Sequence, residues 1–300
     1  MSISAPLLIA VDGGGTGCRA AIGTQRDGIL GRASGGRANI GNDPDKTLVN
    51  VRGAVEEAAA SAGLPHAALE DVTAFIGLAG MNVARDEARL RAALPYARII
   101  ADDDRPACVV GALGEGVAGW VLAIGTGTIA AATDGAGFRY VGSWGFHLAD
   151  QGSGAWLGRG ALNLALQCYD GLLPHSDLTR ALMADFGDNP DAFVAFSLTA
   201  HPGDYAAFAP KVIAAAEAGD RHAEALMHEG AAYYVRALKA LDFTPGGPLC
   251  LLGGIGPHYA RFLPRDHLTG QIAARGSALD GAFQLVCKAA AGEALPCASS

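Results

Sequence analysis

The sequence predicts an α/β protein made of two copies of one domain plan. Its 300 residues exceed the usual size of a single hydrophobic core. The segment LLIAVDGGGTGCRAAIG is echoed half a chain later by WVLAIGTGTIAAATDG, and each reads as an apolar strand, a glycine-rich turn and a second apolar strand. Superposition pairs Gly13 with Gly125, Gly15 with Gly127 and Thr16 with Thr128. Apolar strands that alternate with helices indicate a mostly parallel sheet behind each turn.

Composition excludes several classes of protein. Half of the residues are apolar and 17% are charged, which is typical of a compact soluble chain rather than a disordered one. A net charge of −8 provides no basic face for nucleic acid. The first apolar run stops at Asp12, too early for a signal segment or a membrane span, so we expect a cytoplasmic protein. The six cysteines form no CxxC pair, and we expect reduced thiols.

Local signals set the order of elements in the first half. A hairpin signal at Asp27-Gly28 predicts a meander of strands after the first turn. Apolar residues at helical spacing over 48–62 follow Asn42-Asp43-Pro44 and stop at Gly63. Segments 72–80 and 97–103 read as strands, and 84–94 reads as a helix between them.

The second half repeats the plan with more helix. A second hairpin signal stands at Asp134-Gly135. Helices are expected over 154–169, between 176 and 241, and over 276–291, with a buried strand at 248–254. We place the domain boundary near residue 112, giving domains 1–112 and 113–275, with 276–300 packing back on the first.

The glycine turns suit phosphate binding. Glycine reaches positive φ and lets consecutive backbone N–H groups converge on an anion. A tight hairpin turn explains one such sequence equally well, but two copies favour turns that grip opposite sides of one polyphosphate in a cleft. Thr16, and Thr126 or Thr128, would add hydroxyl donors. No GxxxxGK[ST] occurs, and the single GxGxxG, at 114–119, precedes a strand instead of following one.

A third glycine pair, Gly253-Gly254 in LLGGIG, follows a predicted buried strand. Missing side chains there would leave room for a flat adenine. A turn from strand to helix explains the pair about as well.

Carboxylates stand beside these turns. Asp12 ends the first strand, where it would face phosphate and a Mg²⁺ ion through water. Asp102, Asp103 and Asp104 end another strand, and one of them could deprotonate an attacking hydroxyl, although a solvated acidic loop is the ordinary interpretation. Asp150 has an alternative interpretation as a helix cap, and Asn39 as a turn residue.

Seven segments together resemble the amino-sugar kinases, glucosamine kinase and N-acetylglucosamine kinase, of the family that also holds activator ATPases of benzoyl-CoA reductase and hydroxyacyl-CoA dehydratases. They are, in order, VDGGGT, RANIG, GLAG, the D-x-x-A-x-x-x-G-A run from Asp104, AIGTGT, WGFHLADQGSG and LLGGIG. The resemblance spans nearly the whole chain. It implies the duplicated actin/hexokinase-like (ribonuclease H-like) ATPase fold, with two lobes that close over ATP, Mg²⁺ and the sugar.

The resemblance also implies roles for individual residues. Asp104 would be the base for the sugar 6-hydroxyl. The phosphates would be held by Gly13, Gly14, Gly15, Thr16, Gly125, Thr126 and Gly127, and the adenosine by Gly253 and Gly254. The sugar would contact Asn39, Asp104, Thr128, Gly145 and Asp150.

Some positions depart from the resemblance. Gly17 stands where relatives often carry a polar or basic residue, and Arg105-Pro106 replaces small residues, which keeps Asp103 as a second candidate base. Trp144-Gly145 is closer to the N-acetylglucosamine enzymes, whereas 198–212 is closer to glucosamine kinase. The amine of the substrate is therefore free or acetylated.

Three other functions stay open. An activator ATPase would need cysteines around an iron–sulfur cluster at a dimer interface, and no cysteine pair suits that. The other two are a kinase of another sugar such as N-acetylmuramic acid and an actin-like regulator without turnover. We expect ATP and an amino sugar as partners, no nucleic acid and no membrane, with a homodimer left open.

Overall fold

The computed structural model describes residues 5–298 and divides the chain into two compact units. The first unit runs to Ala118 and adds Thr133–Phe138 and the chain from Ala273 onward; the second holds Gly119–Ala132 and Arg139–Ile272. The sequence placed the boundary near residue 112, before a helix cap and turn that belong to the first unit. The assignment of the two units as ATPase lobes stays a prediction.

The first unit contains a five-stranded sheet in the order β3-β2-β1-β4-β5. The strands are β1 (Leu7–Gly13), β2 (Cys18–Thr24), β3 (Gly28–Gly35), β4 (Thr73–Leu78) and β5 (Arg98–Asp102). The first three form an antiparallel meander, and β4 and β5 run parallel to β1. Gly28 opens β3 with a φ of 73°, so the predicted hairpin at Asp27-Gly28 is confirmed.

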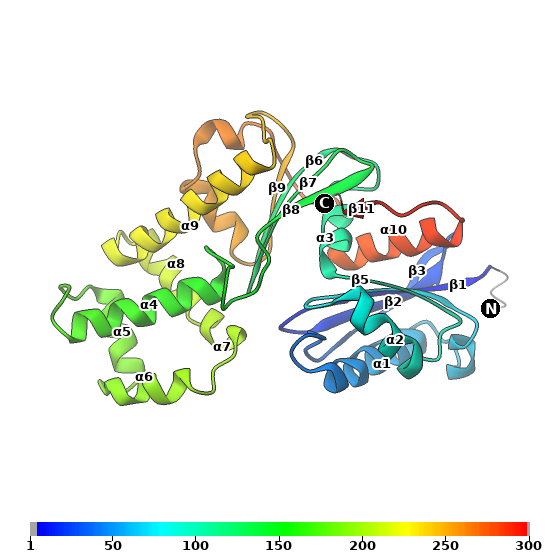
Figure 1. Ribbon diagram of the computed structural model, residues 1–300, viewed down its shortest axis with the longest axis horizontal. Coiled ribbons are helices and arrows are strands. Elements are labelled where there is room, and N and C mark those ends of the chain that lie inside the picture. Colours follow the sequence, from blue (N-terminus) through cyan, green and yellow to red (C-terminus); the bar gives the residue numbers. More distant parts are fainter. Residues whose placement is uncertain (1–4, 299–300) are drawn as a thin grey trace. The chain divides into compact units, whose positions relative to one another are not determined.

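Helices cover both faces of this sheet (Figure 1). They are α1 (Pro44–Ser61), η1 (His66–Leu69), α2 (Val83–Ala93), α3 (Asp104–Leu113) and α10 (Ala278–Ala290). α1 begins where the Asp43 side chain accepts the Lys46 N–H, and Gly63 with a φ of 71° follows its end. Apolar residues of α1, such as Val51 and Val55, pack on the sheet to form the core.

One helix of this unit was not predicted. The sequence predicted that Asp102, Asp103 and Asp104 end a strand. In the structure β5 ends at Asp102, and Asp104 is the first residue of α3. Asp103 caps this helix by accepting the Arg105 N–H. Pro106 is tolerated because its missing N–H falls in the first turn.

The second sheet has six strands in the order β10-β9-β6-β7-β8-β11. They are β6 (Gly119–Ile124), β7 (Thr128–Thr133), β8 (Gly137–Val141), β9 (Leu249–Leu252), β10 (Gln271–Ile272) and β11 (Cys297–Ala298). β9 runs parallel to β6. Asp134 Oδ1 accepts the N–H groups of Ala136 and Gly137, which confirms the second predicted hairpin. A three-strand meander joined by a parallel strand thus occurs twice.

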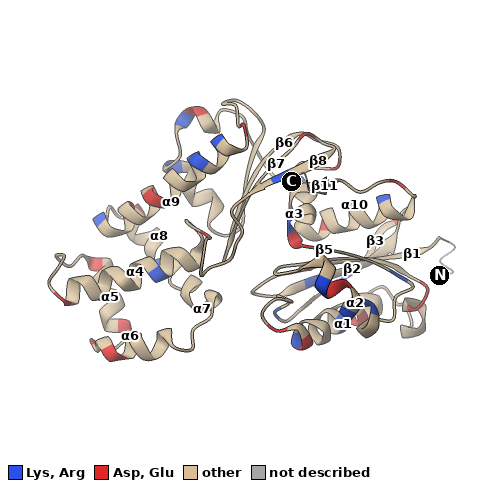
Figure 2. Ribbon diagram, viewed as in Figure 1, with Lys and Arg blue, Asp and Glu red and all other residues tan. Residues whose placement is uncertain are grey.

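The remaining helices of the second unit enclose its core. They are α4 (Gly154–Tyr169), α5 (Asp177–Asp185), α6 (Pro190–Ser197), α7 (Pro202–Ala206), α8 (Ala209–Glu217) and α9 (Arg221–Ala240), with 3₁₀ turns η2 (Gly256–Arg261) and η3 (Arg265–Leu268). α4 has the predicted bounds because Ser153 caps its first turn by accepting the Trp156 N–H. Over residues 5–298, no helix combines the length and the apolar character that crossing a membrane requires. Basic and acidic residues are interspersed in each unit (Figure 2).

Candidate active site

The turn after β1 contains glycines of two kinds. A Cβ on Gly13 would lie 2.5 Å from Leu78 Cδ2 and 2.9 Å from Ala38 Cβ, so packing alone requires glycine there. At Gly14 and Gly15 a Cβ would meet no atom within 4 Å, and neither residue has a positive φ. The fold of the described residues therefore does not explain these two glycines. An open backbone is what close approach of a phosphate requires.

Asp12 lies beside this turn and has a partner that sequence reasoning missed. The β1–β2 register places Arg19 opposite Asp12, and its guanidinium donates to Asp12 Oδ2 at 2.5 Å. Burial raises the pKa of Asp12, while the charge and hydrogen bond of Arg19 oppose the increase. Counting residues across the hairpin would have identified Arg19, had the length of the turn been known.

Strand register brings the acidic residues to one edge of the first sheet. Asp12 pairs with Gly77 of β4, and Gly77 pairs with Asp102 of β5. Because the three strands are parallel, their carboxyl ends meet at the same edge. Asp104 follows two residues after Asp102, and the charge of Asp12 is one of the influences on its pKa.

The three consecutive aspartates have different environments. Asp102 Oδ1 accepts the Asp103 N–H at 2.8 Å, and burial, then the charge of Asp103, raises the pKa of Asp102 to about 6. Asp103 is engaged by the Arg105 N–H and guanidinium. Asp104 has no side-chain partner among the described residues, and its pKa is raised to about 7 by burial, then by the charges of Asp103 and Asp12. Asp103, the second candidate base, is thus committed to the helix cap.

Asn39 reaches the same edge. It forms a bridge with Ala79, just after β4, and the neighbouring Ala38 N–H donates to Gly14 O at 3.0 Å. Asn39 Oδ1 accepts the N–H groups of Gly41 and Asn42, both at 3.1 Å. The side-chain oxygen of Asn39 therefore stabilises the turn, and its amide nitrogen remains the group that a ligand would use.

The turn after β6 repeats the distinction between glycines. Its carbonyls are held by α4, since Gly125 O accepts the Gly154 N–H and Thr126 O accepts the Ala155 N–H. A Cβ on Gly125 would meet nothing within 4 Å, whereas one on Gly127 would lie 3.0 Å from Asp150 Oδ2.

The glycine pair after β9 lies beside this turn, because the Ile255 N–H donates to Ile124 O at 3.0 Å. Gly253 has a φ of 77°, and a Cβ there would come within 2.2 Å of Ile124 O. A Cβ on Gly254 would meet no atom within 4 Å. Gly125 and Gly254 therefore leave open backbone in the second unit, as Gly14 and Gly15 do in the first.

The two turns are not equivalent residue by residue. The first has four residues between its strands and the second has three. Thr16 is exposed within its turn, whereas Thr128 is the first residue of β7 and is buried. The two threonines that the sequence aligned therefore have different environments.

The predicted sugar contacts of the second unit surround Asp150. This residue has a φ of 63° and is buried, and burial raises its pKa although the Thr128 N–H donates to it. Within residues 5–298, Asp150 Oδ1 and Thr128 Oγ1 are buried without a hydrogen-bond partner. Gly145 has a φ of 86°, and its carbonyl accepts the Leu148 and Ala149 N–H groups. A strained, buried carboxylate with a spare acceptor is typical of a ligand site.

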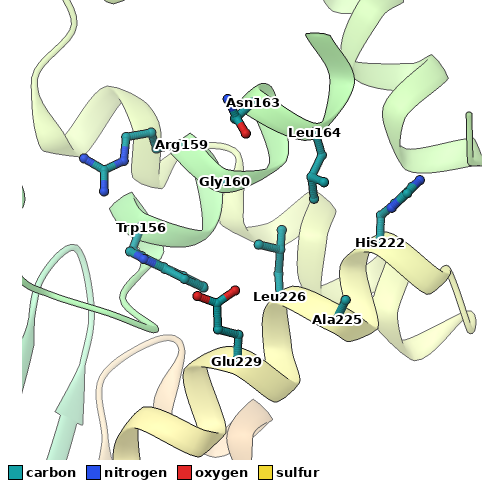
Figure 3. A pocket seen from close by; sticks show the side chains of 9 residues that line it. All are labelled: Trp156, Arg159, Gly160, Asn163, Leu164, His222, Ala225, Leu226 and Glu229. Atoms are coloured by element: carbon teal, nitrogen blue, oxygen red, sulfur yellow. The ribbon is translucent and has the colours of Figure 1, made fainter. Parts of the chain in front are cut away.

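A cavity of about 400 Å³ lies elsewhere in the second unit, between α4 and α9. Figure 3 shows Trp156 and Glu229 turned toward each other across it, with Arg159 and Asn163 pointing away. None of its lining residues is a predicted site residue. Cavity volume alone therefore does not locate the predicted chemistry.

Comparison with known proteins adds independent findings. Residues 9–256 match the BadF/BadG/BcrA/BcrD ATPase family. The sequence is 32% identical to glucosamine kinase GspK of Vibrio cholerae serotype O1, over 93% of this chain and 95% of that protein.

Two solved structures support the fold. A putative N-acetylglucosamine kinase from Chromobacterium violaceum has a TM-score of 0.86 and 33% identity, covering 95% of this chain and 100% of that one. A ROK family glucokinase from Streptomyces griseus, at a TM-score of 0.54, 18% identity and coverage of 93% and 97%, supports the fold alone. The predicted actin/hexokinase-like fold class and the resemblance to amino-sugar kinases are confirmed.

Proposed function

Because the chain belongs to the BadF/BadG/BcrA/BcrD ATPase family, we propose that it is an ATP-dependent kinase that phosphorylates the 6-hydroxyl of an amino sugar, glucosamine or N-acetylglucosamine. The similarity to a glucosamine kinase and to a putative N-acetylglucosamine kinase supports this substrate class. The observation that carries the chemistry is Asp104, whose pKa of about 7 suits a base that works at neutral pH.

Asp104 is the general base of the proposed reaction. Its carboxylate accepts the proton of the sugar hydroxyl as the hydroxyl oxygen forms a bond to the γ-phosphorus of ATP. The bond between that phosphorus and the bridging oxygen of ADP breaks, and ADP leaves with its electron pair. The products are the sugar 6-phosphate, ADP and a proton that is held on Asp104 until it passes to solvent.

The open glycines bind the nucleotide. Gly14 and Gly15 of the first unit, with Gly13 and Thr16, direct backbone and hydroxyl donors at phosphate oxygens. Gly125, Thr126 and Gly127 of the second unit do the same, and Gly253-Gly254 line the adenosine. The support for this assignment is that Gly14, Gly15, Gly125 and Gly254 have space for a Cβ and no packing reason to lack one.

Asp12 is the residue that would hold Mg²⁺. No group of three or more His, Cys, Asp or Glu side chains in the described part of the chain is placed to bind a metal ion. Mg²⁺ is commonly bound by one carboxylate, water and substrate phosphates, so a single buried aspartate beside a phosphate turn fits it. When bound, the ion neutralises charge on the phosphates.

The sugar is held by Asn39 and Asp104 from the first unit and by Thr128, Gly145 and Asp150 from the second. The spare acceptor of Asp150 supports this assignment, as does the amide nitrogen of Asn39, which donates no hydrogen bond within residues 5–298. Hexose recognition requires several such convergent polar groups.

A screen of ADP release at saturating ATP and Mg²⁺ tests the function. Glucosamine, N-acetylglucosamine, N-acetylmuramic acid and glucose are compared, with the Asp104→Asn variant as control. We expect saturable release with one of the first two sugars, and its loss in the variant. ADP release that no sugar stimulates would contradict the proposal. A preference for N-acetylmuramic acid would mean that this sugar, not glucosamine or N-acetylglucosamine, is the substrate.

A further inference from the structure

Three buried side-chain oxygens lie together at the proposed sugar contacts of the second unit. They are Tyr234 Oη on α9, Thr128 Oγ1 at the start of β7 and Asp150 Oδ1 in the loop before α4, and none has a hydrogen-bond partner within residues 5–298. Their residues are 0%, 4% and 6% exposed. Buried polar atoms are rarely left unpaired, so a group of three indicates a functional arrangement.

These groups affect one another. The Thr128 N–H donates to the Asp150 carboxylate. Burial, then the nearby Tyr259, raises the pKa of Tyr234 well above its usual value; a contact with the Thr128 hydroxyl opposes this, and the charge of Asp150 adds to it. Tyr234 therefore keeps its proton at any physiological pH and is a donor beside the Thr128 hydroxyl, although the two oxygens form no hydrogen bond of standard geometry in the sugar-free protein.

Packing holds Tyr234 in place. A Cβ on Gly152 would lie 2.7 Å from Tyr234 Oη, so this glycine is required for the ring to fit beneath the loop that carries Asp150. The ring also meets Tyr259 edge-on, with centroids 4.9 Å apart. Tyr234 has no exposed surface, whereas Thr128 and Asp150 keep 4% and 6% of theirs, so Tyr234 is the member of the group least able to touch a sugar.

We propose that Tyr234 is a positioning residue for the sugar site and acts through Thr128. In the sugar complex the Tyr234 hydroxyl donates to Thr128 Oγ1, so the hydrogen of Thr128 points away from Tyr234, toward the substrate. Thr128 then presents a donor and Asp150 an acceptor to the same sugar hydroxyl. The inference rests on the proposed function, and it adds a residue that no sugar atom contacts.

Tyr234→Phe tests this role because it removes one oxygen and keeps the ring. We expect the KM for the sugar to rise about three- to tenfold, which corresponds to the loss of one neutral hydrogen bond. The KM for ATP should change less than twofold. The melting temperature without sugar should not fall, because the hydroxyl that is removed has no hydrogen-bond partner among the described residues of the sugar-free protein. An unchanged sugar KM would overturn the inference.

Tyr259→Phe is the matched control. Tyr259 is as deeply buried and contacts the same ring, but its hydroxyl donates to Gly152 O at 2.8 Å. We expect this variant to lower the melting temperature and to leave the sugar KM within twofold of wild type. If it raised the sugar KM as much as Tyr234→Phe does, the effect would be one of packing and the inference would be wrong.

A double-mutant cycle tests whether Tyr234 acts through Thr128. In a Thr128→Ala background, Tyr234→Phe should have no further effect on the sugar KM, because the hydroxyl through which it acts is absent. Full additivity would overturn the inference. If the wild-type protein showed no sugar-dependent ADP release, the proposed function would be wrong as well. If the wild type were active and Tyr234→Phe had the same sugar KM, only the inference about Tyr234 would be wrong.

Discussion

Asp102, Asp103 and Asp104 have the same side chain, but the fold gives them different chemistry. Asp102 accepts a backbone N–H at a strand end, Asp103 caps a helix and pairs with Arg105, and Asp104 is left with a raised pKa. Among the described residues, only Asp103 of the three is held by another side chain. A base must accept a proton, and a carboxylate held by a guanidinium does so poorly.

The Asp104→Asn variant should therefore lose activity and keep its fold. We expect kcat to fall by roughly 10² to 10⁴, the usual worth of a positioned base, with the KM for ATP little changed. Steady-state ADP release measures this. Asp103→Ala is the control: it removes a helix cap worth about 1 kcal/mol, so it should lower the melting temperature and reduce kcat far less. Near-normal turnover by Asp104→Asn would exclude Asp104 as the base.

The pKa of Asp104 also sets the expected pH dependence. Its value in the folded protein, about 7, exceeds the usual 3.8, so kcat/KM should rise with pH and level off above about 7. Stability should change in the opposite direction. Asp104 binds its proton more tightly in the folded state than in the unfolded state. The stabilisation that it contributes below pH 4 is therefore lost as the pH rises to 7. In Asp104→Asn this loss with pH should be smaller in thermal melts; an identical slope in both proteins would contradict the environment assigned to Asp104.

At the scale of elements, the strand–turn–strand units separate glycines that packing needs from glycines that it does not. Gly13 and Gly253 would clash with neighbouring atoms if they carried a Cβ, and Gly14 and Gly254 would not. Sequence patterns cannot make this distinction, because both kinds stand side by side in one motif. The clash atoms come from segments far along the chain, such as Leu78 against Gly13.

Gly14→Ala and Gly13→Ala form a matched pair for this difference. The first should leave the melting temperature within about 2 °C of wild type and raise the KM for ATP several-fold, because the added methyl meets only the ligand. The second should lower the melting temperature clearly, since overpacking commonly costs about 1–3 kcal/mol. Thermal melts and ATP titrations measure both. A Gly14→Ala variant with normal ATP affinity would remove that glycine from the phosphate site.

At the scale of the whole molecule, the proposed function requires both units to serve one nucleotide. Gly14 and Gly125 belong to different units, and both leave their backbone open. Gly125→Ala should therefore raise the KM for ATP to an extent similar to Gly14→Ala. An effect in only one unit would mean that the duplicated turn does not have a duplicated role.

The activator alternative is also tested on the whole protein. Cys18, Cys168 and Cys250 are buried thiols that could not hold a cluster at an interface. Protein purified without oxygen should contain no stoichiometric iron or sulfide, measured by metal and sulfide analysis. Stoichiometric iron with intact activity would restore the activator hypothesis.

The sequence by itself determined the features that local chemistry specifies. Alternating apolar runs, hairpin dipeptides and helix caps predicted both meanders, α1, α4 and the repeated glycine turns, because each signal acts over a few residues. The family motifs also selected Asp104 as the candidate base.

Only the tertiary structure decided the environments of these residues. It showed that Asp104 opens a helix, that Arg19 faces Asp12 and that Tyr234 lies beside Thr128. Burial and charge pairing depend on neighbours that lie far apart along the chain. α9 contributes Tyr234 about a hundred residues after Thr128, and no local pattern encodes that approach.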